Sequence, residues 1–198
     1  GTHLSTPTTR RAAGAALSYA ARHGVTRVLD IDYRPVLWGL TSRGAGDNRY
    51  VADAQVTRQL QEMLPQFDLL VGTEEEFLIA GGVAGDLIAS LRAVRAISAA
   101  VLVVKRGALG CCVIEDEVPG RIDEAPTFPG ERVEVLSILG AGDACLAGLM
   151  TSLLQGEDWA SSTRVAIRFG RSCNSRVWPG FPLISPRLRI RLSAPAAA

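Results

Sequence analysis

Leu139-Gly140-Ala141-Gly142-Asp143-Ala144 joins two apolar runs through a glycine-rich turn. The apolar run at 133–139 predicts a strand, and the run at 144–150 predicts a helix. A strand that ends in small residues and opens a helix leaves unpaired backbone N–H groups at the helix N-terminus. Those groups and the helix dipole favour an anion at this turn.

Asp143 places a carboxylate beside these N–H groups, and simple anion binding does not explain it. A carboxylate there can accept a proton while the amides of Gly140, Ala141 and Gly142 stabilise a phosphoryl group in transfer. A purely structural turn is the alternative. Because no Lys followed by Ser or Thr comes after the glycines, the turn is not a Walker P-loop.

The same tetrapeptide occurs earlier, at Gly44-Ala45-Gly46-Asp47, between Thr41-Ser42-Arg43 and Asn48-Arg49-Tyr50. No apolar strand leads into this copy and no apolar helix follows it directly. We therefore interpret it as a surface loop. The comparison indicates that the flanking sequence, rather than the tetrapeptide itself, makes the second copy a candidate site.

The chain has 198 residues and is 47% hydrophobic, which is enough for one sizeable core. No apolar run approaches the length of a membrane span and no signal peptide is visible, so we expect a cytoplasmic protein with no membrane partner. The absence of an initiator Met suggests an excised or incomplete chain. The four cysteines lack metal-ligand spacing and are predicted to be small buried side chains in a reducing compartment.

The net charge of +1 conceals an uneven distribution, because no acidic residue follows Asp158 whereas seven arginines do. Such an end could bind nucleic acid, but no nucleic-acid-binding motif accompanies it, so we expect no nucleic-acid partner. We predict an atypical Arg/Pro/Ala-rich tail at 164–198, solvated or poorly ordered. A frameshift or a truncated gene would explain its composition.

Short apolar runs alternate with helical patterns along the rest of the chain. The predicted helices lie at about 8–23, 51–64, 74–80, 87–97, 143–154 and 158–170, and the predicted strands at 27–31, 67–71, 100–104, 109–114 and 133–139. Strands that are apolar throughout are typical of a parallel sheet covered on both faces. The alternation therefore predicts an α/β fold.

Polar side chains follow four of these strands at the point where each strand ends. They are Asp30, Asp32 and Arg34; Thr73 and Glu76; Lys105 and Gly107; and the Gly140 turn. Ligands of open parallel sheets bind at the carboxyl ends of the strands. We therefore expect these four groups to converge on one edge of the sheet.

Four segments occur in the order and spacing found in the ribokinase-like (PfkB) sugar kinases: 30–38, 71–77, 104–110 and 139–144. The chain resembles the carboxyl-terminal part of that family's domain from about Leu17 to Trp159. The resemblance implies a ribokinase-like three-layer α/β/α fold with a mostly parallel sheet. It also implies that residues 1–163 form the ATP-binding and catalytic-base side of the domain.

The resemblance further implies a role for each matching residue. Asp143 would be the base that takes the proton from a primary hydroxyl of the sugar. The N–H groups of Gly140, Ala141 and Gly142 would form the anion hole. Glu76 would order the water shell of Mg²⁺.

Other matching positions would border the nucleotide or the substrate. Lys105, Gly107, Gly110 and Thr73 fall on the nucleotide side, with Thr73 where many relatives have Asn. Asp32 and Arg34 fall on an Asp-x-Asn-x-Arg segment, with Asp32 in place of Asn. A guanidinium there could meet a phosphate or an acidic sugar.

Several of these residues also have a structural interpretation. Glu74–Glu76 could simply cap a helix. Lys105-Arg106 could be a solvated turn, and Asp30–Arg34 could be a surface ion-pair cluster. Trp38 is predicted to pack in the core rather than to support a substrate.

The activity that the resemblance implies is ATP-dependent phosphorylation of a primary hydroxyl of a sugar or keto-sugar acid, with ATP and Mg²⁺ as cofactors. The match is best to members that act on a keto-sugar acid of inositol catabolism. The family's N-terminal half, with many sugar contacts and the lid through which a homo-oligomer could form, has no counterpart here. We therefore expect this chain alone to bind sugar poorly and to have little kinase activity.

Two other functions stay open. A Rossmann dinucleotide-binding oxidoreductase would need a third glycine, but the pattern breaks at Cys145. A non-catalytic remnant, or a binding partner of another chain, is the second alternative.

Overall fold

The structure, a computed structural model, describes residues 1–42, 50–130, 134 and 139–174. The first copy of the tetrapeptide, most of the predicted strand at 133–139 and the chain from 175 lie outside the described residues. The chain divides into two compact units, Gly1–Gly130 and Glu131–Ala198, and each is described by itself.

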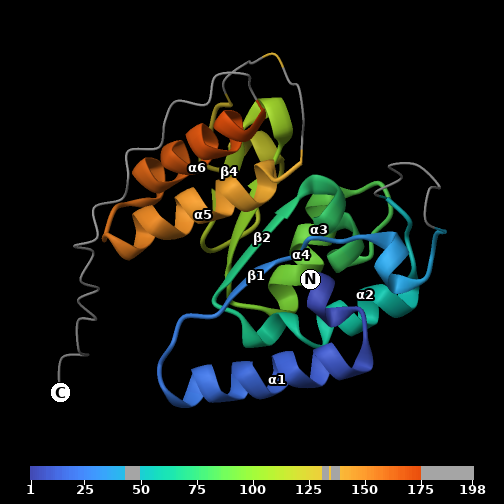
Figure 1. Cartoon of the computed structure of the whole chain (residues 1–198). Coiled ribbons are helices and arrows are strands. Elements are labelled where there is room, and N and C mark those ends of the chain that lie inside the picture. The colour runs from blue at the N-terminus through green and yellow to red at the C-terminus, as the bar shows by residue number, and fades with distance from the viewer. Residues whose placement is uncertain (43–49, 131–133, 135–138, 175–198) are drawn as a thin grey trace. The chain divides into compact units, whose positions relative to one another are not determined.

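The first unit contains a five-stranded sheet in the order β1-β2-β3-β4-β5 (Figure 1). β1 (Val28–Asp30), β2 (Leu69–Thr73) and β3 (Val101–Lys105) are parallel, whereas β4 (Cys111–Ile114) and β5 (Thr127–Phe128) continue the sheet antiparallel. The predicted α/β fold is confirmed, and the predicted strands at 100–104 and 109–114 correspond to β3 and β4, which pair antiparallel. β5 was not predicted, because a two-residue strand carries no periodicity.

The helix α1 (Pro7–Arg22) precedes β1, α2 (Ala54–Gln61) connects β1 to β2, and α3 (Glu74–Gly81) and α4 (Leu87–Ile97) connect β2 to β3. Short 3₁₀ turns lie at Thr2–Leu4, Pro35–Trp38, Leu64–Gln66, Gly107–Leu109 and Ile122–Glu124. The helix predicted at 51–64 begins later, because Asp53 is its N-cap and accepts the N–H groups of Gln55 and Val56 at 2.8 and 2.9 Å.

One face of the sheet forms the main core. Leu29, Leu70, Leu102 and Ile114 are neighbours in register across β1 to β4, and all four are buried. The helices cover this face with further buried side chains: Leu60, Phe77 and Leu91. Trp38 packs against the same cluster, which confirms the prediction that it belongs to the core.

The alternate residues of the central strands are buried as well. Leu69, Val71 and Val103 are each no more than 4% exposed. Burial of successive residues explains why these strands are apolar throughout rather than alternating. Cys111 and Cys112 follow the same pattern, and both are buried thiols on β4.

The described part of the second unit is a pair of packed helices, α5 (Ala141–Leu154) and α6 (Trp159–Asn174). Gly148 permits their close approach, because a Cβ there would lie 3.1 Å from the Phe169 ring. The prediction that all four cysteines are buried is wrong for Cys145 and Cys173, which are half-buried on these two helices.

Among the helices of the described residues, none has the length and apolar character needed to cross a lipid bilayer.

Two glycines that follow β3 should respond differently to substitution. Gly110 has φ 92°, and a Cβ there would collide with the backbone carbonyl of Phe128. Gly110→Ala should therefore lower the free energy of unfolding by about 2–5 kcal/mol, from left-handed strain and overpacking together. Urea denaturation of the purified chain measures this loss.

Gly107 provides the matched control. It also has a positive φ, 56°, but a Cβ there would meet nothing within 4 Å. Gly107→Ala should cost only the left-handed strain, about 1–2 kcal/mol. Equal losses in the two variants would show that the approach of the Phe128 backbone does not constrain Gly110.

Candidate functional site

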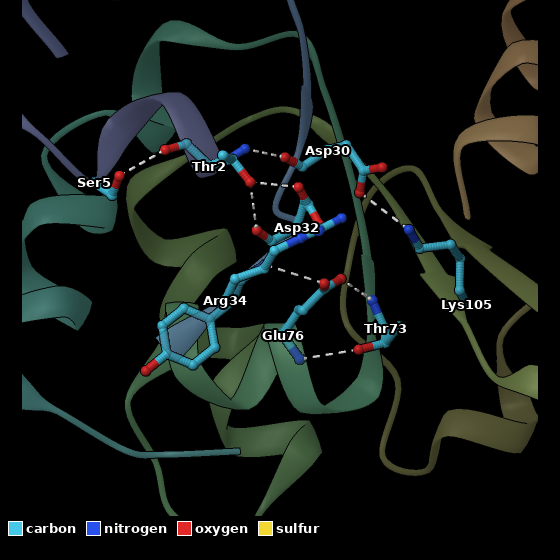
Figure 2. Close-up of polar contacts among 10 residues, drawn as sticks. Thr2, Ser5, Asp30, Asp32, Arg34, Thr73, Glu76 and Lys105 are labelled. Carbon is cyan, nitrogen blue, oxygen red and sulfur yellow. Dashed lines mark hydrogen bonds and ion pairs between the residues drawn. The ribbon is translucent and has the colours of Figure 1, made fainter. Parts of the chain in front are cut away.

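A capping box at the start of α3 joins Thr73 and Glu76 (Figure 2). Thr73 Oγ1 accepts the N–H of Glu76 at 3.2 Å, and Glu76 Oε2 accepts the N–H of Thr73 at 2.7 Å. This arrangement satisfies two N–H groups that the helix itself cannot pair. The capping interpretation of this acidic segment is therefore confirmed for Glu76.

Glu76 also holds the end of a second strand. Its Oε1 accepts the N–H of Tyr33 at 3.2 Å, just beyond β1. Gly72 makes room for the carboxylate, because a Cβ at that position would lie 3.3 Å from Glu76 Oε2 and 2.9 Å from Ile31 Cδ1. Burial raises the pKa of Glu76, although Lys105 and the two backbone donors oppose the shift.

The Asp32 backbone departs from the usual conformation. Its φ of 33° is the only positive value of a non-glycine residue in the described part of the chain, and Asp tolerates this region better than most residues. Thr2 Oγ1 donates a hydrogen bond to Asp32 Oδ2, and Arg34 Nε donates to Asp32 Oδ1 at 3.0 Å. Burial by itself would raise the pKa of Asp32, but the Thr2 and Arg34 donors outweigh burial and hold this pKa below its ordinary value.

Tyr33 lies between Asp32 and Arg34 in the sequence. Its ring is buried and its hydroxyl donates to the carbonyl oxygen of Val51 at 2.6 Å. Burial raises the pKa of Tyr33 to about 12, so the hydroxyl stays protonated and can keep donating. Tyr33 therefore anchors the segment that presents Asp32 and Arg34.

Lys105 and Asp30 form an ion pair across the sheet, with Lys105 Nζ 3.0 Å from Asp30 Oδ1 (Figure 2). Their side chains are only 14% and 18% exposed. The next residue, Arg106, is 10% exposed and donates to Glu74 at 2.7 Å and to Asp123 at 2.9 Å. The alternative that Lys105-Arg106 is a solvated turn is therefore wrong.

The Gly140 turn belongs to the second unit. Gly140 has φ 79° and precedes α5, whose first turn contains Ala141, Gly142 and the exposed Asp143. The helix begins two residues earlier than predicted, because the N–H of Ala144 already donates to the carbonyl of Gly140 at 2.9 Å. The first N–H groups of α5 thus lack intrahelical partners, beside the Asp143 carboxylate.

The expected convergence is confirmed within the first unit, where three polar groups gather at the carboxyl ends of β1, β2 and β3. The fourth group lies in the second unit. Two contributors were missed from the sequence: Thr2, which contacts Asp32, and Ser5, whose hydroxyl donates to the Thr2 carbonyl at 2.8 Å. No local pattern marks them, because Thr2 lies 30 residues from its partner.

Glu76 is the candidate for holding Mg²⁺ through water. Within the described residues no group of three or more His, Cys, Asp or Glu side chains could hold a metal ion directly. Mg²⁺ often keeps several waters and uses one or two carboxylates together with substrate phosphates. Each Glu76 oxygen accepts a backbone hydrogen bond and has a second lone pair, so this carboxylate fits such an outer contact.

Comparison with known proteins decides the family. Residues 6–176 match the pfkB family of carbohydrate kinases. The chain belongs to the pfkB family. Membership in this family of carbohydrate kinases does not favour a dinucleotide-binding oxidoreductase.

Curated pfkB relatives share the name 5-dehydro-2-deoxygluconokinase. The protein from Bacillus subtilis is 27% identical over 178 residues, covering 89% of this chain and 48% of its own length. The protein from Photobacterium profundum is 32% identical over 183 residues, covering 88% of this chain and 50% of its own length. The chain thus spans about half the length of the curated relatives it matches.

Solved structures of kinases have the same fold. Aminoimidazole riboside kinase from Salmonella enterica superposes with a TM-score of 0.69 at 19% identity, covering 88% of this chain and 54% of that one. Fructokinase from Vibrio cholerae, solved with fructose, ADP and calcium, superposes with a TM-score of 0.70 at 20% identity. The match covers 88% of this chain and 53% of the fructokinase. These likenesses confirm the ribokinase-like α/β fold.

Because of Glu76, the free energy of unfolding of the chain should fall as the pH rises. Because its pKa is raised above the ordinary 4.5, the folded chain holds this proton more tightly than the unfolded chain. The stabilisation is complete below the unfolded pKa and is lost as pH rises through the folded pKa. Relative to Glu76→Gln, the wild type should lose up to about 1.4 kcal/mol of unfolding free energy per pH unit in that window.

Urea denaturation at intervals from pH 4 to pH 7 measures the difference. Glu75→Gln is the control, because Glu75 is an exposed neighbour on the same helix turn. Stability curves that run parallel for the wild type and Glu76→Gln would contradict the raised pKa.

Proposed function

We propose that this chain forms the nucleotide-binding and catalytic-base side of an ATP-dependent kinase that phosphorylates a primary hydroxyl of a sugar or keto-sugar acid. The observation that carries the proposal is the exposed Asp143 carboxylate in the first turn of α5, directly after the left-handed Gly140. Membership in the pfkB family supports the same chemistry.

Asp143 is proposed as the base. A sugar hydroxyl is a poor nucleophile until its proton has an acceptor, and a carboxylate at the point of attack provides one. The backbone N–H groups of Gly140, Ala141 and Gly142 then stabilise the charge on the transferring phosphoryl group. Phosphoryl transfer depends mainly on positioning and charge stabilisation, so these groups suffice for the protein's part at the reacting centre.

The nucleotide side of the proposed site lies at the ends of β2 and β3. Lys105 supplies an ammonium group for phosphate oxygens, with Thr73 and Gly107 beside it. Mg²⁺, when bound, would neutralise charge on the phosphates, and Glu76 would hold its water ligands. Gly110 contributes indirectly, because its missing Cβ lets the Phe128 backbone close the loop.

The proposed acceptor is 5-dehydro-2-deoxy-D-gluconate, in inositol catabolism, which the names of the curated relatives suggest. Arg34 and Asp32 would meet its acidic or phosphorylated end, since a guanidinium pairs well with a carboxylate or a phosphate. We further propose a cytoplasmic location and a possible homo-oligomer. Residues 1–163 would form the kinase part, with 164–198 as an atypical tail that begins within α6.

Asp143→Asn should remove the proposed base. In the complete gene product, kcat for phosphorylation should fall by roughly 10²–10⁴-fold while KM for ATP changes little, because the amide cannot accept the hydroxyl proton. ADP release with 5-dehydro-2-deoxy-D-gluconate as acceptor measures both constants.

The chain contains its own matched control. Asp47→Asn makes the same substitution in the other Gly-Ala-Gly-Asp sequence and should leave kcat unchanged. Near-wild-type activity of Asp143→Asn, or an equal loss in Asp47→Asn, would remove Asp143 from the role of base.

Calorimetry on the purified chain separates the proposed function from the alternatives. The chain should bind Mg-ATP and should not bind NAD, because the glycine pattern lacks the third glycine of a dinucleotide site. Binding of NAD alone would favour an oxidoreductase. Binding of neither ligand would favour a non-catalytic remnant.

A further inference from the structure

Two carboxylates, those of Asp30 and Glu76, lie near the Lys105 ammonium at the edge of the sheet. Asp30 ends β1, Glu76 lies in the first turn of α3 after β2, and Lys105 ends β3. Figure 2 shows the Lys105 ammonium directed at Asp30 and the Glu76 carboxylate directed at backbone N–H groups. Asp30 is the first residue of the Asp-x-Asn-x-Arg segment that also contains Asp32 and Arg34.

The register of the sheet explains why Asp30 reaches Lys105. Asp30 pairs with Val71 and Lys105 pairs with Thr73, so both side chains stand on the same face, two positions apart along β2. Val71 between them is buried and apolar, so it offers neither charge a partner. The long stem of Lys105 spans β2 and brings Nζ to 3.0 Å from Asp30 Oδ1.

Because Asp30 and Lys105 are mostly buried, each depends on the other as a partner for its charge. Both side chains of the pair are less than one-fifth exposed, and a buried charge that loses its partner is strongly unfavourable. Without the Asp30 carboxylate, the flexible Lys105 side chain would seek another anion. Glu76 is close enough for the charges of both Lys105 and Asp30 to act on it, and it is half-buried beside them.

We propose that Asp30 is a positioning residue, whose carboxylate holds the Lys105 ammonium on itself rather than on Glu76. The Glu76 carboxylate then stays available for the water shell of a divalent cation. Lys105 Nζ then stays at the carboxyl end of β3, where the proposed site binds phosphate oxygens. The consequence for ligand binding rests on the proposed kinase function, whereas the position of the ammonium does not.

The first test needs no ligand. In Asp30→Asn, Lys105 should move to Glu76, so the nuclear Overhauser effect between the Lys105 ε-CH₂ and Glu76 γ-CH₂ protons should strengthen severalfold relative to the wild type. Selective labelling of Lys and Glu in the chain resolves these signals. An unchanged effect would overturn the proposal, whatever the protein binds.

The second test compares ATP binding with and without Mg²⁺ by calorimetry. In Asp30→Asn the advantage of Mg-ATP over metal-free ATP should shrink, on the order of tenfold, because a Lys105–Glu76 pair occupies the carboxylate. In Asp30→Asn/Lys105→Met the Lys105 ammonium is gone and cannot move to Glu76, so the advantage should return to that of Lys105→Met alone. A double variant that keeps the small advantage of Asp30→Asn would overturn the proposal.

The matched control is Asp68→Asn, which breaks the Arg27–Asp68 ion pair at the amino ends of β1 and β2, away from the candidate site. It should leave both measurements at their wild-type values. Asp30→Ser replaces Asp30→Asn if that variant does not fold. Failure of the wild type to bind ATP in either form would count against the proposed function, and the proton measurement would still decide the role of Asp30.

Discussion

The Glu76 carboxylate ties together the ends of two parallel strands, and the arrangement of the site in the first unit depends on it. One oxygen accepts the N–H of Thr73 after β2, and the other accepts the N–H of Tyr33 after β1. Both strand ends turn into loops that carry polar side chains. Without this shared acceptor, two backbone donors beside a buried core would lack partners, which is costly.

Charge balance at the carboxyl edge of the sheet follows from this anchor. Lys105 pairs with Asp30, and Arg106 pairs with Glu74 and Asp123. Each cation is mostly withdrawn from water, so each needs a carboxylate near it. The basic groups at this edge of the sheet are therefore already paired with carboxylates.

Local sequence patterns predict most of the secondary structure. The helix predicted at 87–97 is α4, because Asp86 caps a strongly amphipathic segment. β2 and β3 lie within about two residues of the predicted strands, because their residues are apolar throughout. β5 was not predicted. The left-handed backbone of Asp32 was not predicted either, because a neighbouring helix and the hydroxyl of the distant Thr2 support that conformation, and the residues next to Asp32 in the sequence do not indicate it.

The sequence by itself determined the alternation of strands and helices, the capping residues and the motifs that indicate a carbohydrate kinase. These depend on residues a few positions apart, so local physical chemistry is sufficient. Only the tertiary structure decided which charges meet, as in the pairing of Lys105 with Asp30, 75 residues earlier in the chain. Pairing at that separation depends on sheet order and register, because parallel strands bring their carboxyl ends together whatever lies between them in the sequence.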